Sequence, residues 1–183
     1  MTTHPLDPHP PTADLAAATA AEIAADLEAG RTTSVEVTRA LLDRIAAVDD
    51  SGVELRAVLA TNPAALDEAA RLDAELAAGT VRGPLHGVPI LVKDNIEAVG
   101  LPATAGSLAP LREAGLVVLG ATNLSEWANL RSPRSTSGWS AVGGLTGNPW
   151  SLDRSAGGSS SGSGAAVAGG LAPLAIGTET DGS

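Results

Sequence analysis

The chain has almost no aromatic side chains with which to fill a core. Among its 183 residues there is no Phe, no Tyr and only three Trp, although 44% of the residues are apolar. The core therefore has to be built from Ala, Leu, Val and Ile, so its helices must approach one another closely across small side chains. The length is sufficient for one such core, either as a single domain or as part of a larger one.

The charge balance is strongly acidic, with a formal net charge of -10 and a pI near 4.6. A nucleic-acid binder needs a basic face, so we expect no nucleic-acid partner. The chain has no Cys, and its His, Asp and Glu residues form no cluster at metal-ligand spacing. We therefore expect no disulfide, Cys nucleophile, metal or other cofactor. There is no uncharged apolar run of about 18 residues that could cross a membrane. Because Met1–Pro11 also lacks the pattern of a secretory signal, we expect a soluble protein of the cytoplasm.

The first part of the chain carries helical patterns. A Pro-rich stretch at residues 1–13 is expected to be a flexible tail. Helices are then predicted at Asp14–Ala29, from the capping box of Thr33 and Glu36 onward, and from Asn62-Pro63 to about Ala78. A short run at residues 55–60 between the last two predicts a strand. This part of the chain is therefore expected to be mainly helical.

The pattern changes beyond residue 80, where short apolar runs alternate with Gly-rich turns. Buried strands are predicted at residues 88–92, 116–119 and 174–176, with a helix over Ala165–Leu171 and an ordered loop over 131–146. The pattern indicates an α/β fold with a mixed sheet covered by helices on both faces. The run G-G-S-S-S-G-S-G at residues 157–164 has the composition of a flexible linker. It lies within a strand-helix-strand pattern, which favours an ordered segment instead.

The distribution of basic residues singles out Lys93. The chain has ten Arg and one Lys, and that Lys directly follows the predicted strand at 88–92. Arg keeps its proton at any useful pH, whereas a lysine removed from water can lose it and act as a base. The alternative is an ordinary lysine at a strand end, paired with Asp94.

Several serines stand among glycines, namely Ser159, Ser160, Ser161, Ser163 and, in G-T-E-T-D-G-S, Ser183. Glycines on both sides let backbone N–H groups converge on an anion, either a phosphate or the oxyanion of acyl transfer. The sequence lacks the phosphate-binding motifs, which favours the second use. Outside the tail the one histidine is His86, for which a structural hydrogen bond is the favoured interpretation. A Ser–Lys arrangement is therefore the more natural source of a serine nucleophile.

Three long segments together resemble the amidase signature family. They are G-P-L-H-G-V-P-I-L-V-K-D-N-I at 83–96, G-A-T-N-L-S-E-W-A-N at 120–129 and A-G-G-S-S-S-G-S-G through G-T-E-T-D-G-S at 156–183. The resemblance runs from about Asp14 to the last residue and is strongest to members of the peptide-amidase type. It implies the amidase signature fold, truncated here, with residues 14–183 as the N-terminal part of that domain.

The resemblance also implies a catalytic triad. Ser183 matches the nucleophile, Ser159 the bridging serine after a cis peptide bond, and Lys93 the base. The implied reaction is hydrolysis of a carboxamide, in a small molecule or a peptide amide, through an acyl-enzyme. The backbone around Thr180, Asp181, Gly182 and Ser183 would stabilise the oxyanion and bind substrate.

Two departures from the family keep other hypotheses open. The segment between Ser107 and Leu111 is shorter than in the family, so we expect a short helix in the crossover there. The family domain also continues well beyond Ser183. The chain as given could therefore be an inactive fragment or pseudoenzyme, or belong to the A subunit of a tRNA-dependent amidotransferase.

Overall fold

The structure, a computed structural model, describes residues 14–96, 109–130 and 133–179. Its centre is a four-stranded sheet in the order β1-β3-β2-β6, formed by Val58–Thr61 (β1), Pro89–Lys93 (β2), Val117–Thr122 (β3) and Ala175–Ile176 (β6). β2 runs parallel to β3 and β6, whereas β1 runs antiparallel to β3. The sheet is therefore mixed, and all four predicted strands are present.

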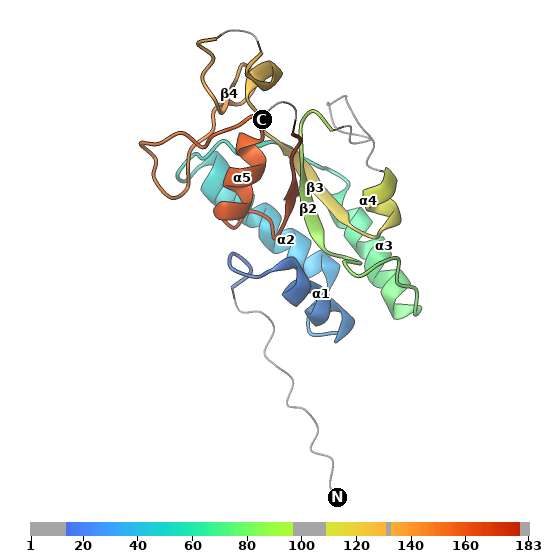
Figure 1. Ribbon diagram of the computed structural model, residues 1–183. Helices are drawn as coiled ribbons and strands as arrows, with labels where there is room; N and C mark the ends of the chain where they lie inside the picture. The colour runs from blue at the N-terminus through green and yellow to red at the C-terminus, as the bar shows by residue number, and fades with distance from the viewer. Residues whose placement is uncertain (1–13, 97–108, 131–132, 180–183) are drawn as a thin grey trace, which may run out of the picture.

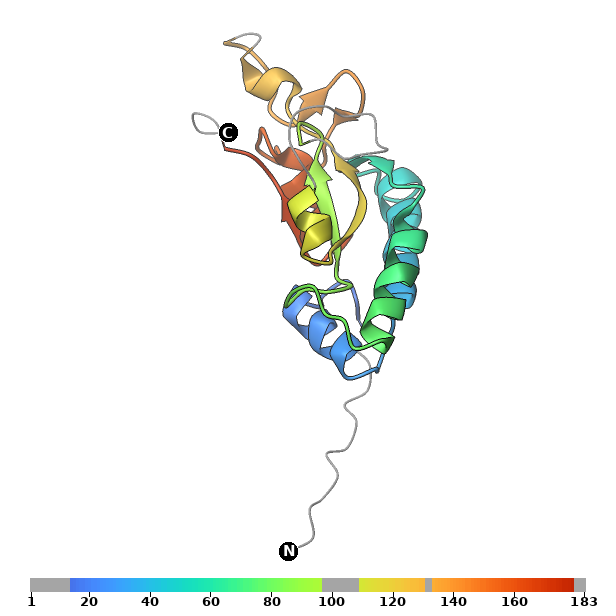
Figure 2. The same ribbon diagram turned by 90° about the vertical axis from the view of Figure 1, so that its right-hand side faces the viewer.

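Helices lie on both sides of this sheet. They are α2 (Ser34–Arg44), α3 (Ala65–Ala77), α4 (Ala109–Glu113) and α5 (Ser161–Ala168). In Figure 2, α2 and α4 stand on opposite sides of β2 and β3, while α3 packs against both α2 and β3. The helix α5 packs against β2, β3 and β6, and its end is tied to α2 by the Arg44 guanidinium, which donates to the carbonyls of Gly169 and Gly170. The α/β fold class expected from the sequence is confirmed.

The two ends of the sheet carry different structures. Figure 1 shows α1 (Ala20–Glu28) at one end and a small hairpin at the other. The hairpin consists of β4 (Trp139–Ser140) and β5 (Gly144–Leu145). The expectation of a loop over 131–146 was wrong at this point, because Trp139 and Ser140 pair with Leu145 and Gly144.

Capping decides where the first helices begin. Thr33 and Glu36 form the predicted capping box, and α2 begins at Ser34 before passing into a π-helical turn, η1 (Ile45–Asp50). The predicted start of α1 at Asp14 was wrong. The Asp14 carboxylate accepts from the N–H of Ala16 and closes a turn, and a second capping box at Thr19 starts the helix at Ala20.

The third helix begins a little later than its sequence signal predicts. Asn62 accepts from the N–H of Ala64, and α3 starts at Ala65. The same Asn62 side chain donates to the carbonyl of Val118 at 2.8 Å. Asn62 thus lies between the end of β1 and the start of α3, and it joins both elements to β3.

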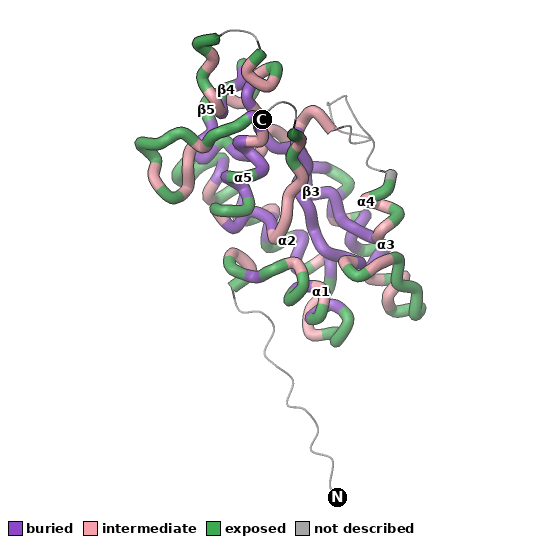
Figure 3. Tube along the Cα trace, viewed as in Figure 1, coloured by how far each residue is buried: buried purple, intermediate pink, exposed green. Residues whose placement is uncertain are grey.

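The core is close-packed through small residues, as the composition predicts. Figure 3 shows β2 and β3 buried along their whole length. At Gly162 in α5 an added Cβ would lie 2.4 Å from the carbonyl oxygen of Ala57, so α5 contacts the neighbouring backbone directly. The serines Ser159, Ser161 and Ser163 are buried, which contradicts the linker interpretation of the Gly/Ser run.

In the described part of the connection from β2 to β3, which excludes residues 97–108, the helix is α4, five residues long, and this agrees with the short helix expected there. The tail at 1–13 and the segment Ala105–Ser107 lie outside the described residues. Across the ranges that the structure describes, no helix is both long and apolar enough to cross a membrane.

Candidate functional site

Lys93 is the last residue of β2 and is almost completely buried, with 1% of its surface exposed. Its Nζ donates to Ser159 Oγ at 2.6 Å and to Thr178 Oγ1 at 2.7 Å. Burial lowers the pKa of the Lys93 ammonium, because removal from water disfavours the charged form. The sequence-based expectation of a desolvated lysine at a strand end is met, and its partners are hydroxyl groups.

Ser159 lies in the turn that leads into α5, with its side chain buried. The Gly158–Ser159 peptide bond is cis, as the resemblance implied. The carbonyl of Ser159 accepts from the N–H of Ser125 at 2.9 Å. A Cβ added to Gly158 would lie 2.2 Å from Ser125 Oγ, so only glycine fits beside this serine. Contacts with Ser125 therefore hold the turn that presents Ser159 to Lys93.

Thr178 completes the group of hydroxyls around Lys93, although sequence analysis did not select it. Its Oγ1 accepts from Asn95 Nδ2 at 2.9 Å as well as from Lys93. Its backbone is held by Ser160, whose Oγ accepts from the N–H of Thr178 and donates to its carbonyl. The signal for Thr178 was its position in G-T-E-T-D-G-S, but nothing in the sequence placed it next to a lysine 85 residues earlier.

This arrangement can transfer protons. A neutral lysine amine has one lone pair and two N–H groups. With an N–H directed to Thr178 Oγ1, the lone pair is free to accept the proton of Ser159. The short contact and the lowered pKa of Lys93 both favour a serine hydroxyl that can relay a proton.

The remaining residues that the resemblance assigned to the site are Thr180, Asp181, Gly182 and Ser183. They lie outside the described residues, which end at Glu179. Thr178, in hydrogen-bond contact with Lys93, precedes Ser183 by five positions along the chain.

An open cavity of about 680 Å³ lies over the Lys93–Ser159 pair. Its lining is polar where it meets these two residues and Asn95, and mostly apolar elsewhere. The other lining residues are Leu59, Asp94, Leu124, Glu126, Trp127, Ala128, Leu130, Ser140, Ala141 and Val142. Part of this lining is η2 (Glu126–Asn129), which belongs to the S-E-W-A-N motif singled out from the sequence.

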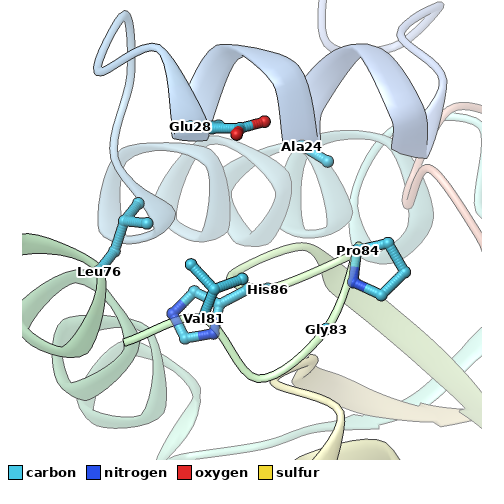
Figure 4. Close-up of a pocket in the computed structure, with 7 residues that line it drawn as sticks. All are labelled: Ala24, Glu28, Leu76, Val81, Gly83, Pro84 and His86. Atoms are coloured by element: carbon cyan, nitrogen blue, oxygen red, sulfur yellow. The ribbon is translucent and has the colours of Figure 1, made fainter. Parts of the chain in front are cut away.

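A smaller cavity of about 210 Å³ lies at the other end of β2, between α1, the end of α3 and the loop before β2. Figure 4 shows His86 among its lining residues, together with Glu28 and Val81. The ring nitrogens of His86 contact backbone groups: Nδ1 accepts from the N–H of Arg82, and Nε2 lies 2.9 Å from the carbonyl oxygen of Leu72. The structural interpretation of His86 is confirmed.

A buried lysine is thus hydrogen-bonded to a serine hydroxyl at the end of a strand in a mixed α/β sheet, an arrangement that can pass a proton between the two groups. The chain belongs to the amidase family, whose family model matches residues 36–183. Peptide amidase from Stenotrophomonas maltophilia is 53% identical, with a TM-score of 0.86, over 91% of this chain and 37% of that one. An amidase family protein from Bacillus anthracis is 36% identical, with a TM-score of 0.83, over 90% of this chain and 35% of the other.

A curated relative of a different kind is also similar. The A subunit of glutamyl-tRNA(Gln) amidotransferase from Acidothermus cellulolyticus is 45% identical over 93% of this chain and 35% of its own length. The chain thus spans roughly a third of the length of the relatives that it matches.

Proposed function

We propose that residues 14–183 are the N-terminal part of an amidase signature domain that hydrolyses carboxamides through Lys93, Ser159 and Ser183. The observation that carries this proposal is the 2.6 Å contact between Lys93 Nζ and Ser159 Oγ in a buried site. Two groups of this kind have no structural need to meet there, since a buried lysine costs free energy that an apolar residue would not.

The proposed reaction begins with neutral Lys93. It accepts the proton of Ser159 as Ser159 accepts the proton of Ser183, and Ser183 Oγ attacks the amide carbonyl. Backbone N–H groups of Thr180, Asp181, Gly182 and Ser183 hold the oxyanion. The Lys93 ammonium returns its proton through Ser159 to the leaving nitrogen, which departs as an amine or ammonia.

Water completes the cycle. The same relay removes a proton from water, which attacks the ester of Ser183 and releases a carboxylic acid. Atoms and protons balance with water as the sole co-reactant. The lowered pKa of Lys93 supports this role, because the base must be neutral when substrate arrives.

The substrate class proposed is a small carboxamide or a peptide amide. The similarity to peptide amidase, at 53% identity, supports this class. The acidic net charge supports the absence of a direct nucleic-acid partner.

The test uses the naturally produced polypeptide that carries this sequence, after its intact mass has been measured. Release of ammonia from a peptide amide is then followed for the wild type, Lys93→Ala and Ser183→Ala. Each variant is expected to lose roughly 10³-fold or more in kcat/KM. Ser151→Ala, on an exposed loop, serves as the matched control and should keep the wild-type rate. A wild-type rate in either triad variant would overturn the proposal.

A second candidate is the A subunit of a tRNA-dependent amidotransferase, which the similarity to such subunits favours. This function needs a partner that supplies a tRNA-binding surface, since the present chain is acidic. Affinity purification of the natural polypeptide separates the two candidates. A stoichiometric partner that raises amide turnover supports the amidotransferase, whereas full activity of the isolated polypeptide supports the amidase. An absence of turnover with and without a partner would support the inactive-fragment hypothesis.

A further inference from the structure

The hydroxyl group of Thr178 is in contact with two nitrogen atoms at once. Lys93 Nζ lies 2.7 Å from its Oγ1, and Asn95 Nδ2 lies 2.9 Å from the same atom. The mechanism proposed above uses Lys93 and gives Asn95 no part. Because both nitrogens bind one oxygen, the hydrogen bond from Asn95 changes what that oxygen offers to Lys93.

The turn that follows β2 fixes Asn95 next to this hydroxyl. The N–H of Asp94 donates to the carbonyl of Thr122 at 3.1 Å, and the N–H of Ile96 donates to the carbonyl of the last residue of β2 at 2.8 Å. The backbone on both sides of Asn95 is therefore held by the ends of β2 and β3. The side chain presents its NH₂ group to Thr178, and its Oδ1 is buried without a hydrogen-bond partner in the part of the chain that the structure describes.

Thr178 does not need Asn95 to stay in place. Ser160 Oγ accepts from the N–H of Thr178 at 3.2 Å and donates to its carbonyl at 3.0 Å, so the backbone of Thr178 is held on both sides. Its β-branched side chain is also stiff at χ1. The contact from Asn95 is thus left to act on the hydroxyl oxygen itself.

The direction of this hydrogen bond decides which form of Lys93 it favours. Asn95 Nδ2 can only donate, so it directs the positive end of the amide dipole at Thr178 Oγ1. An ammonium on Lys93 has to share that oxygen with a second donor, and it lies near positively polarised hydrogens. Both effects disfavour the charged form of Lys93 relative to the neutral amine.

The charges around Lys93 come from few places. The sequences of β3, β6 and α5, which pack against β2, contain no charged residue, and the buried residues of α2 are uncharged as well. The charged residues that line the cavity together with Lys93 are Asp94 and Glu126. Their carboxylates favour the ammonium, so burial and the Asn95 amide act in the opposite direction to them.

We propose that Asn95 is a positioning residue that keeps Lys93 in its neutral, proton-accepting form by donating its amide N–H to the hydroxyl of Thr178. The inference rests on the proposed function and adds to it a residue that acts on the base through a third side chain.

The first experiment observes Lys93 itself and requires no turnover. The natural polypeptide is labelled with carbon-13 at lysine Cε, and the NMR signal that Lys93→Met removes is titrated from pH 6 to pH 11. Asn95→Leu keeps the size of the side chain without its N–H, and it should raise the pKa of Lys93 by roughly half a unit to one unit. Asn95→Asp places a carboxylate there and should raise the pKa by roughly one unit or more. Asn148→Asp makes the same change of charge on a loop that does not line the cavity, and it should leave the pKa unchanged.

The second experiment follows kcat/KM for a peptide amide against pH. In Asn95→Leu the rise of kcat/KM should move to higher pH, so that the value near pH 7 falls roughly threefold to tenfold while the plateau at high pH stays at the wild-type value. An equal loss at every pH would show a structural role only and would overturn the inference. An unchanged pKa of Lys93 in Asn95→Leu would do the same, and if that variant does not fold, an unchanged pKa in Asn95→Asp decides against it. The expected change in the NMR titration without any amide turnover would support the inference and count against the proposed function.

Discussion

The two ends of strand β2 each hold a buried basic side chain, and the partners of these two side chains differ in kind. His86, before the strand, is 6% exposed, and Lys93, at its last residue, is 1% exposed. The His86 ring contacts the carbonyl of Leu72 and the N–H of Arg82, which are backbone groups. Lys93 contacts the side-chain hydroxyls of Ser159 and Thr178.

The difference lies in what the partners can do. A backbone carbonyl only accepts a hydrogen bond and cannot release a proton, so His86 serves to join α3 to the loop before β2. A hydroxyl both accepts and donates, so a proton can pass through Ser159 to or from Lys93. An open cavity of about 680 Å³ is lined by that pair. Burial alone therefore does not distinguish a side chain that can exchange a proton with its partner from one that is held by the backbone, whereas the chemistry of the partners does.

The largest effect should come from removing the amine at the Lys93 end. Lys93→Met keeps the length of the side chain and should lower kcat/KM for a carboxamide by roughly 10³-fold or more, because no base remains. The measurement is ammonia release by the natural polypeptide, with circular dichroism as the control for folding. Substantial activity in the folded variant would remove the contrast between the two ends of β2.

The pH dependence of activity and of stability tests the same difference between Lys93 and His86. In the proposed mechanism neutral Lys93 is the active form, so kcat/KM should rise with pH and level off below 10.5, the ordinary pKa of lysine, because burial lowers the pKa of Lys93. The unfolded chain binds more protons than the folded one between the two pKa values, so this residue makes stability increase with pH there. Denaturation of wild type and Lys93→Met is therefore measured from pH 6 to pH 10. As the pH falls, the free energy of unfolding of the wild type should decrease relative to that of Lys93→Met. A difference that is constant with pH would contradict the lowered pKa.

At the opposite end, His86→Ala should affect stability and not chemistry. The change leaves the carbonyl of Leu72 and the N–H of Arg82 without their partner, at a cost of about 1–3 kcal/mol each when buried. Urea denaturation should show a lower midpoint, while kcat per folded molecule stays at the wild-type value. A loss of kcat in fully folded protein would show that this end also contributes to the reaction.

The smallest expected effect concerns a position remote from both ends of the comparison. Thr33→Ala removes the hydroxyl that caps α2 and should lower the free energy of unfolding by about 1 kcal/mol. Thr33→Ser keeps the cap and is the matched control. Both variants should retain wild-type kcat, and equal stability of the two would mean that the capping box contributes nothing.

Local signals were sufficient for most elements. The capping box at Thr33 and the apolar run before Lys93 each specify their structure within a few residues. The helix predicted over Ala165–Leu171 is present, but it begins within the Gly/Ser run, at Ser161, and ends at Ala168. Where the prediction of an element from the sequence was wrong, another local contact determined the structure of that segment. The Asp14 carboxylate closes a turn in place of a helix, and Trp139 forms a hairpin by pairing with Leu145.

The sequence by itself determined that the chain needs a closely packed core of small side chains, and that its one lysine stands at the end of a buried strand. Its motifs also carried the resemblance to the amidase family. Only the tertiary structure decided that Thr178, 85 residues beyond Lys93, accepts from its Nζ, and that the turn Trp127–Asn129 flanks the same cavity. The physical reason is that neighbouring parallel strands bring their carboxyl ends together at one edge of a sheet. Residues remote in sequence meet there, and no local pattern records which of them will touch.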